Sequence, residues 1–167
     1  MPKTKVFIID ADALIHAYRY DFPPAGNHGG FWEWLNELAN SFEIFIPESV
    51  IKEIKDGNDG LADLLSNLRN LKYLSTEDSL KHVPAVLKAY GTLTEIDLEI
   101  IGSKADPYVI AHAIELRATV VTNEKPEPGR TAPRNKKIPD ICSTLKVAYV
   151  RYPHFIWEMR GQPKTSL

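Results

Sequence analysis

Four acidic residues stand at comparable places along the chain, each close to the end of a predicted helix or strand. Asp10 ends an apolar run at residues 6–9, Glu53 lies in the helix after the second predicted strand, Asp106 begins the helix before the third, and Glu124 follows the third. Sites in open α/β sheets form outside the carboxyl ends of the strands. These four acids are therefore placed to converge on one pocket.

Each acid also has a simpler explanation. Asp is a favoured helix N-cap, and Pro107 at the first helical position fits Asp106 as such a cap. Asp10 fits the same role, and Asp12 is then an acid in the first helical turn. Glu53 lies beside an apolar helix stripe, where a surface acid paired with a lysine is common. A cap and a metal ligand are compatible, because a carboxylate has two oxygens.

Several carboxylates in one pocket repel each other, and a divalent cation removes that cost. Mg²⁺ takes oxygen ligands, activates water and stabilises the charge that develops on a phosphodiester. The sequence holds no His/Cys set at zinc spacing. The acids therefore favour a hard, oxygen-bound ion such as Mg²⁺ or Mn²⁺.

The elements that would position these acids alternate between strand and helix. Strands are expected at residues 6–9, 43–47, 119–122 and 146–150, and helices at 11–18, 31–39, 47–55, 106–117, 138–145 and 153–159. Leucine spacing predicts a helix over 61–74, another is expected over 79–90, and no strong strand is expected in this middle region. The alternation predicts an α/β fold with a mainly parallel sheet and a helix-rich middle insertion.

Composition narrows the class of protein. The 167 residues, 44% hydrophobic and 25% charged, fit a single domain over residues 1–160 with a frayed tail at 161–167. The net charge of -2 supplies no general basic field for nucleic acid. The single cysteine, Cys142, excludes an intrachain disulfide and is expected to be buried. No apolar run spans a bilayer and no signal peptide is evident, so we expect a cytoplasmic protein without membrane contact.

One local basic cluster stands out in the loop at residues 125–137. It contains Lys125, Arg130, Arg134, Lys136 and Lys137, among prolines and glycine. A solvated loop and a binding patch both fit this composition.

Four segments resemble the PIN-domain ribonucleases, which include the VapC-type toxins of toxin–antitoxin modules. They are residues 8–15 (IIDADALI), 46–54 (IPESVIKEI), 105–113 (ADPYVIAHA) and 120–124 (VVTNE). Residues 137–142 (KIPDIC) further resemble a PIN-like branch of bacterial and archaeal proteins. The resemblance runs in order across nearly the whole chain.

The resemblance implies a three-layer α/β/α fold and metal-dependent endonucleolytic cleavage of RNA. It implies that Asp10, Glu53 and Asp106 hold the metal and that Glu124 stands for a fourth acid, usually Asp. Asp12 stands where the family usually has Asn, so it is a candidate to support the ligands rather than to bind the ion directly. Arg130, Arg134, Lys136 and Lys137 become candidate contacts to the RNA backbone. A homodimer and a small antitoxin are the implied protein partners.

Two other functions fit parts of the sequence. Asp10-Ala11-Asp12 after an apolar strand also resembles the first motif of haloacid-dehalogenase-type phosphatases, in which the first Asp is the nucleophile. The stretch at residues 57–63 resembles their late acidic motif, although here it follows a polar helix end rather than a strand. The chain also fits a PIN-like interaction module without catalysis, with Asp12 and Glu124 as departures from a working site.

Overall fold

A five-stranded parallel sheet forms the centre of the protein. The computed structural model describes residues 4–26 and 29–161. The strands are β1 (Val6–Ile9), β2 (Glu43–Pro47), β3 (Lys72–Leu74), β4 (Thr119–Thr122) and β5 (Tyr149–Arg151). Their order in the sheet is β3-β2-β1-β4-β5, and every neighbouring pair is parallel. The predicted α/β class with a mainly parallel sheet is confirmed.

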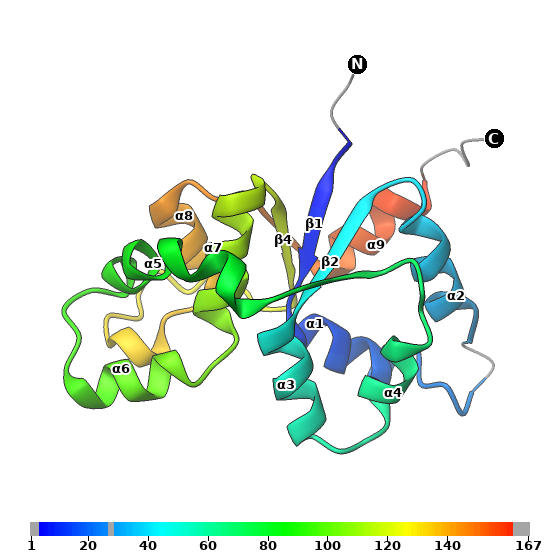
Figure 1. The fold of residues 1–167 in the computed structure, drawn as a ribbon, viewed down its shortest axis with the longest axis horizontal. Coiled ribbons are helices and arrows are strands. Elements are labelled where there is room, and N and C mark those ends of the chain that lie inside the picture. The colour runs from blue at the N-terminus through cyan, green and yellow to red at the C-terminus, as the bar shows by residue number, and fades with distance from the viewer. Residues whose placement is uncertain (1–3, 27–28, 162–167) are drawn as a thin grey trace.

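Helices cover both faces of this sheet (Figure 1). The α-helices are α1 (Ala11–His16), α2 (Gly29–Leu38), α3 (Glu48–Asp56), α4 (Leu61–Ser66), α5 (Val83–Tyr90), α6 (Glu95–Gly102), α7 (Asp106–Leu116), α8 (Ile138–Leu145) and α9 (Tyr152–Arg160). A π-helical turn η1 (Ala17–Asp21) extends α1, and η2 (Thr76–His82) and η3 (Pro133–Asn135) are 3-10 helices. α7 packs on β1, β2 and β4 with α5 and α8 beside it, and α9 packs on β4 and β5. The predicted three-layer α/β/α arrangement is confirmed.

The central strand β1 is buried on both faces. Phe7, Ile8 and Ile9 are at most 4% exposed, which is what a continuous apolar run in a parallel sheet requires. The Phe7 ring meets Phe42 and Phe155 edge-on, so α9 is anchored to one face of the strand. Central burial fixes the end of β1, and with it the position of Asp10.

The prediction of one long helix at residues 61–74 is wrong. The helix ends at Ser66, the chain turns, and residues 72–74 form the edge strand β3. Asn70 stabilises the turn, because its backbone N–H donates to the Asn36 side chain and its own amide donates to the Asn36 carbonyl. Leu68 and Leu71 are buried in this turn rather than on a helix. The regular leucine spacing therefore reflects buried leucines in α4 and in the turn that follows it, rather than one face of a single helix.

The boundaries of the C-terminal elements shift slightly from those predicted. Lys146 closes α8 in the left-handed conformation at φ 56°, so the last strand begins at Tyr149 rather than at 146. Cys142 is buried and free, as expected. No helix in the described ranges is long and apolar enough to cross a membrane. Beyond Gly161, the predicted tail lies outside the described residues.

His112 is buried inside α7 and makes stability depend on pH. Its side chain is 1% exposed, and within the described part of the chain its Nε2 has no hydrogen-bond partner. Burial lowers the pKa of His112, against the opposing charges of Asp78 in η2 and Glu115 in α7. Because the folded-state pKa lies below the unfolded value, the unfolded chain binds this proton first. The stabilising contribution is complete above about pH 6.5 and is lost as the pH falls below it.

Replacing His112 with glutamine should remove the part of the pH dependence of stability that is due to His112. The free energy of unfolding of the wild type, minus that of His112→Gln, is expected to fall between about pH 7 and pH 5. Urea unfolding across this range measures the difference. The exposed His154 offers a matched control, since His154→Gln removes one histidine without changing the core. Parallel curves for His112→Gln and the wild type would contradict the assignment.

Candidate metal centre

Asp10 and Glu124 lie at the carboxyl edge of the sheet, just past the ends of β1 and β4. Because β1 and β4 are parallel neighbours, both strands end at this edge. The Asp10 backbone N–H donates to the Val121 carbonyl at 2.9 Å and so extends the pairing by one residue. Asp10 follows β1 directly and is 3% exposed. A buried carboxylate at a strand end needs strong compensating partners.

Both oxygens of Asp10 accept hydrogen bonds. Oδ1 accepts from the Ala11 N–H at 2.7 Å, which makes Asp10 the N-cap of α1, and Oδ2 accepts from Thr122 Oγ1 at 3.1 Å. Burial and the nearby charge of Asp12 raise the pKa of Asp10 well above its usual range, with smaller contributions from Asp106 and Glu124. The cap therefore accounts for one oxygen, while the other faces a group of acids.

The Thr122 hydroxyl connects the acids at this edge. Its fully buried hydroxyl lies 3.1 Å from Asp10 Oδ2 and 3.3 Å from Asp12 Oδ1, and it accepts from the Glu124 N–H at 3.2 Å. A hydroxyl has one proton, so it donates to only one of the two carboxylates at a time. Asp12 Oδ1 also accepts from the Asn123 N–H at 3.0 Å. One polar side chain thus positions three acids.

Glu53 and Asp106 meet where α3 approaches the start of α7. The predicted N-cap role of Asp106 is wrong: Ala105 occupies the cap position, already in helical conformation, and Asp106 is the first helical residue. The carboxylate that serves this helix start belongs to Glu53, whose Oε2 accepts from the Ala105 N–H at 3.3 Å. A carboxylate here also complements the helix dipole. Glu53 itself is exposed.

The Asp106 carboxylate is left without hydrogen bonds in the part of the chain that the structure describes. Burial, followed by the charges of Glu124 and Glu53, raises the pKa of Asp106, while Lys104 lowers it. Asp106 is therefore the acid with the most unused coordinating capacity.

Glu124 is tied to the start of α8. Its Oε2 accepts from the Ile138 N–H at 2.7 Å, and Lys137 Nζ lies 3.7 Å from its Oε1. Burial raises the pKa of Glu124, and the Ile138 bond and the Lys137 charge partly offset this rise. Three helices, α1, α7 and α8, thus begin against carboxylates of this group.

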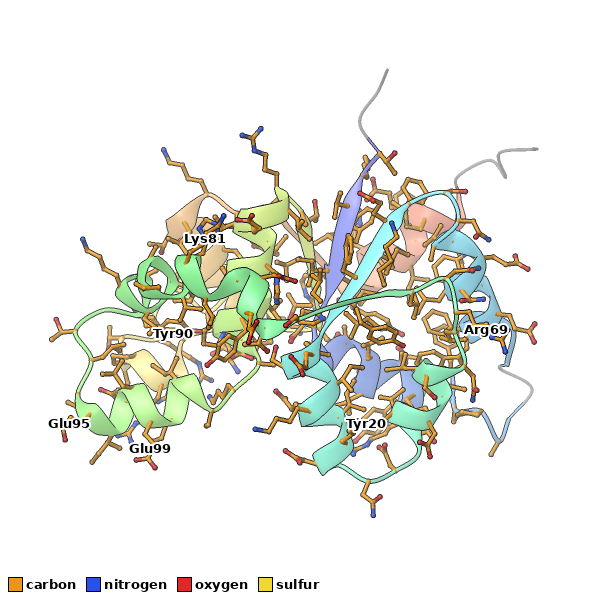
Figure 2. The ribbon with its side chains drawn as sticks, viewed as in Figure 1. Tyr20, Arg69, Lys81, Tyr90, Glu95 and Glu99 are labelled. Atoms are coloured by element: carbon orange, nitrogen blue, oxygen red, sulfur yellow. The ribbon has the colours of Figure 1, made fainter. Side chains whose placement is uncertain are left out.

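Sequence reasoning missed a tyrosine near these acids. Tyr90 ends α5 and is 2% exposed, and Figure 2 labels it on the α5–α6 side of the molecule. Burial raises the pKa of Tyr90, as do the charges of Asp106 and Glu124, so its hydroxyl keeps its proton at neutral pH. The only sequence signal was an aromatic residue directly before a helix-ending glycine.

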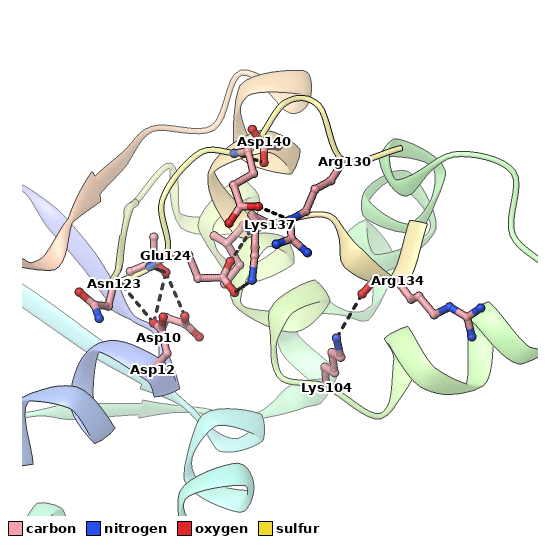
Figure 3. Close-up of polar contacts among 12 residues, drawn as sticks. Asp10, Asp12, Lys104, Asn123, Glu124, Arg130, Arg134, Lys137 and Asp140 are labelled. Atoms are coloured by element: carbon pink, nitrogen blue, oxygen red, sulfur yellow. Dashed lines mark hydrogen bonds and ion pairs between the residues drawn. The ribbon is translucent and has the colours of Figure 1, made fainter. Parts of the chain in front are cut away.

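The basic loop does not present its cations as one open patch. Arg130 forms an ion pair with Glu127, Lys137 lies against Glu124, and the Arg134 carbonyl accepts from Lys104 Nζ at 3.4 Å (Figure 3). Two of the four predicted RNA contacts are therefore already paired with acids.

An open cleft of about 820 Å³ adjoins the acids between α3 and the start of α7. Five carboxylates and three lysines line it, including Glu53, Asp106 and Glu124. All candidate ligands offer carboxylate oxygens, the donors that hard divalent cations prefer, so the donor chemistry fits Mg²⁺ or Mn²⁺. Among the described residues, no three acid, histidine or cysteine side chains approach closely enough to share one ion.

Most of the chain matches one family model. The model, a domain of unknown function designated DUF4411, covers residues 7–162. The chain belongs to the DUF4411 family. A search of curated proteins gives no match.

Among solved structures, the DUF4411 chain is similar to a chain in the crystal structure of VapBC2 from Rickettsia felis bound to a DNA fragment from their promoter. The two are 16% identical, the match covers 87% of this chain and 98% of that chain, and the TM-score is 0.53. This likeness shows that the two chains share a fold.

The phosphatase alternative does not fit the DUF4411 structure. Its late acidic motif requires an acid at a strand end, but Asp59 lies in the turn between α3 and α4. The Asp59 carboxylate accepts from Arg19 Nε at 2.8 Å and from the Leu61 N–H at 3.3 Å. Asp59 thus closes a turn instead of joining Asp10.

Proposed function

We propose that this protein is a divalent-metal-dependent endoribonuclease that uses Mg²⁺ or Mn²⁺. One observation carries the proposal: burial and the charges of Asp12, Asp106 and Glu124 raise the pKa of Asp10, and burial and the charges of Glu124 and Glu53 raise the pKa of Asp106. A cluster with this repulsion gains from a bound cation. The proposal assigns the metal to Asp10, Glu53, Asp106 and Glu124.

Each residue has a defined task in this proposal. Asp106 offers an unshared carboxylate, while Asp10 is held rigidly by Ala11 and Thr122. Asp12 accepts a hydrogen bond from the Asn123 N–H, and it shares the Thr122 hydroxyl with Asp10, so it helps to position Asp10. A bound divalent cation supplies charge neutralisation for these acids and Lewis-acid stabilisation for a phosphodiester.

The proposal extends to the partners of the protein. The similar structure is a complex named VapBC2 bound to promoter DNA. We carry over from this likeness a role as the toxin of a toxin–antitoxin pair, with a small antitoxin and a homodimer. Arg134 and Lys136 remain candidate RNA contacts, whereas Arg130 and Lys137 would first have to leave their acids.

A second candidate is an interaction module without catalysis. It is favoured by the lack of three described ligand-type side chains close enough to share an ion. The two functions differ in metal binding and in cleavage.

Removing the metal should abolish activity. We expect the purified protein to cleave a labelled RNA with Mg²⁺ or Mn²⁺ present and to stop when EDTA is added, because unneutralised acids repel phosphate. Gel analysis of cleavage and calorimetric titration with Mn²⁺ measure the two steps separately. Asp106→Asn should weaken Mn²⁺ binding. Protein that neither binds Mn²⁺ nor cleaves RNA would favour the interaction module.

A further inference from the structure

Lysines stand on both walls of the 820 Å³ cleft. Lys52 and Lys55 line it from α3, and Lys104 lines it from the segment before α7. Lys52 and Lys55 are three residues apart, so they project from neighbouring positions on one helix face. Glu53 lies between them in sequence and Asp106 lines the same cleft. Cations therefore flank the acids on two sides.

Among the described residues, the lysines of the cleft are not held in close ion pairs, although five carboxylates line the same cleft. In the described ranges, neither Lys52 nor Lys55 forms an ion pair, and the hydrogen bond of Lys104 goes to a carbonyl, that of Arg134. The basic loop differs, because its Arg130 and Lys137 face acids. These unpaired cations therefore line the same cleft as Glu53 and Asp106.

The cleft also carries an unsatisfied hydroxyl. Ser49 lines it near the start of α3, and its Oγ is buried without a hydrogen-bond partner in the described structure. Such a group destabilises the folded protein, because its lost hydrogen bonds to water are not replaced. A side-chain rotation toward the cleft would let Ser49 donate to an anionic oxygen.

We propose that this cleft is a track for the backbone of the RNA substrate, in which Lys52 and Lys55 bind phosphates next to the cleavage site. The proposal rests on the endoribonuclease function proposed above and names residues that position the substrate. Lys104 faces the track from the opposite wall. Phosphate contacts of this kind set affinity and register without reading sequence. A single strand fits best, because its phosphates can follow the walls while one of them reaches the partly buried acids.

The test measures binding of a fluorescent single-stranded RNA at different salt concentrations. The protein carries Asp10→Asn to prevent cleavage, and Mg²⁺ is present throughout. Each phosphate contact contributes about -0.7 to the slope of log K against log salt for a single strand. Lys52→Ala/Lys55→Ala should therefore flatten the slope by about 1.4 between about 50 and 200 mM salt. Lys104 is left intact, because its charge also lowers the pKa of Asp106.

A matched control removes two other exposed charges. Arg69 in the turn after α4 and Lys88 on α5 do not line the cleft, and Figure 2 labels Arg69 at the end of the molecule opposite Glu95 and Glu99. Arg69→Ala/Lys88→Ala should leave the slope unchanged. In the cleaving protein, Lys52→Ala/Lys55→Ala should raise KM more than it lowers kcat, because it removes substrate binding away from the reacting phosphate.

Ser49→Ala supplies a second readout. The variant should bind RNA more weakly with an unchanged salt slope, because a hydroxyl releases no counterion. It should also unfold at a temperature no lower than the wild type, since it removes an unsatisfied buried group.

The outcomes separate this proposal from the proposed function. Metal-dependent cleavage combined with an unchanged slope in Lys52→Ala/Lys55→Ala would overturn the track alone. An equal loss in the control pair, or equally tight binding of duplex RNA, would overturn it as well. Failure of the wild type to bind or cleave RNA would overturn both.

Discussion

Asp10→Asn is expected to lower metal-dependent RNA cleavage by about 100-fold or more, because a lost metal ligand removes several kcal/mol of transition-state stabilisation. Asparagine keeps the shape of the side chain and can still accept from the Ala11 N–H. The loss should therefore reflect charge rather than folding. Initial cleavage rates at saturating Mn²⁺ measure it.

The same substitution should leave the metal-free protein at least as stable as the wild type. Burial and Asp12 disfavour the charge of Asp10, and asparagine removes that charge. Thermal unfolding in EDTA tests this expectation. Asp63→Asn on the exposed face of α4 is a matched control that should change neither quantity. If the protein is a toxin, Asp10→Asn should also relieve growth arrest on expression, and equal toxicity would count against the assignment.

Thr122→Val is expected to reduce both stability and activity. Valine fills the same fully buried space, but it cannot donate to Asp10 or Asp12, nor accept from the Glu124 N–H. Unsatisfied buried groups of this kind cost about 1–3 kcal/mol. Loss of a group that orients metal ligands typically costs about 10–100-fold in affinity or activity.

Chemical denaturation and Mn²⁺ titration measure the two effects of Thr122→Val. Thr122→Ser keeps the hydroxyl and should recover most of the Mn²⁺ affinity, although it leaves a small cavity. A Thr122→Val protein with unchanged Mn²⁺ affinity would show that the hydroxyl supports the fold and not the site.

The strands that could be predicted from the sequence are those with a run of consecutive strand-forming residues between helical segments. In β1 and β4 every residue after the first is buried, and the sequence predicts both strands at residues 6–9 and 119–122. The edge strand β3 has only three residues, and two of them are exposed. Such a short segment has no alternation of apolar and polar residues from which a strand could be predicted. The position of β3 depends on the preceding turn, which is stabilised by the hydrogen bond between Asn70 and Asn36. These two residues are 34 positions apart in the sequence.

The acids of the candidate site could be predicted from their positions near the ends of strands and helices. The residues that hydrogen-bond to them could not. Asp10 and Glu124 follow strands, and parallel strands end at one edge. The connecting role of Thr122 depends on contacts to Asp10 and Asp12 across more than 100 residues. The helix start at Asp106 shifted because Ala105 already has helical backbone angles and Glu53, from another helix, serves its N–H.

The strand order β3-β2-β1-β4-β5 also bears on how the protein matures during synthesis. β1 is made first but lies in the middle, and its second neighbour, β4, is completed only at Thr122. Glu124 is then held by Ile138, later still in the chain. A ribosome-bound fragment that stops before β4 therefore carries Asp10 without Thr122 or Glu124. The contacts of the acid group are complete only after Ile138 has been translated, so a nascent chain that ends before this residue lacks the assembled site.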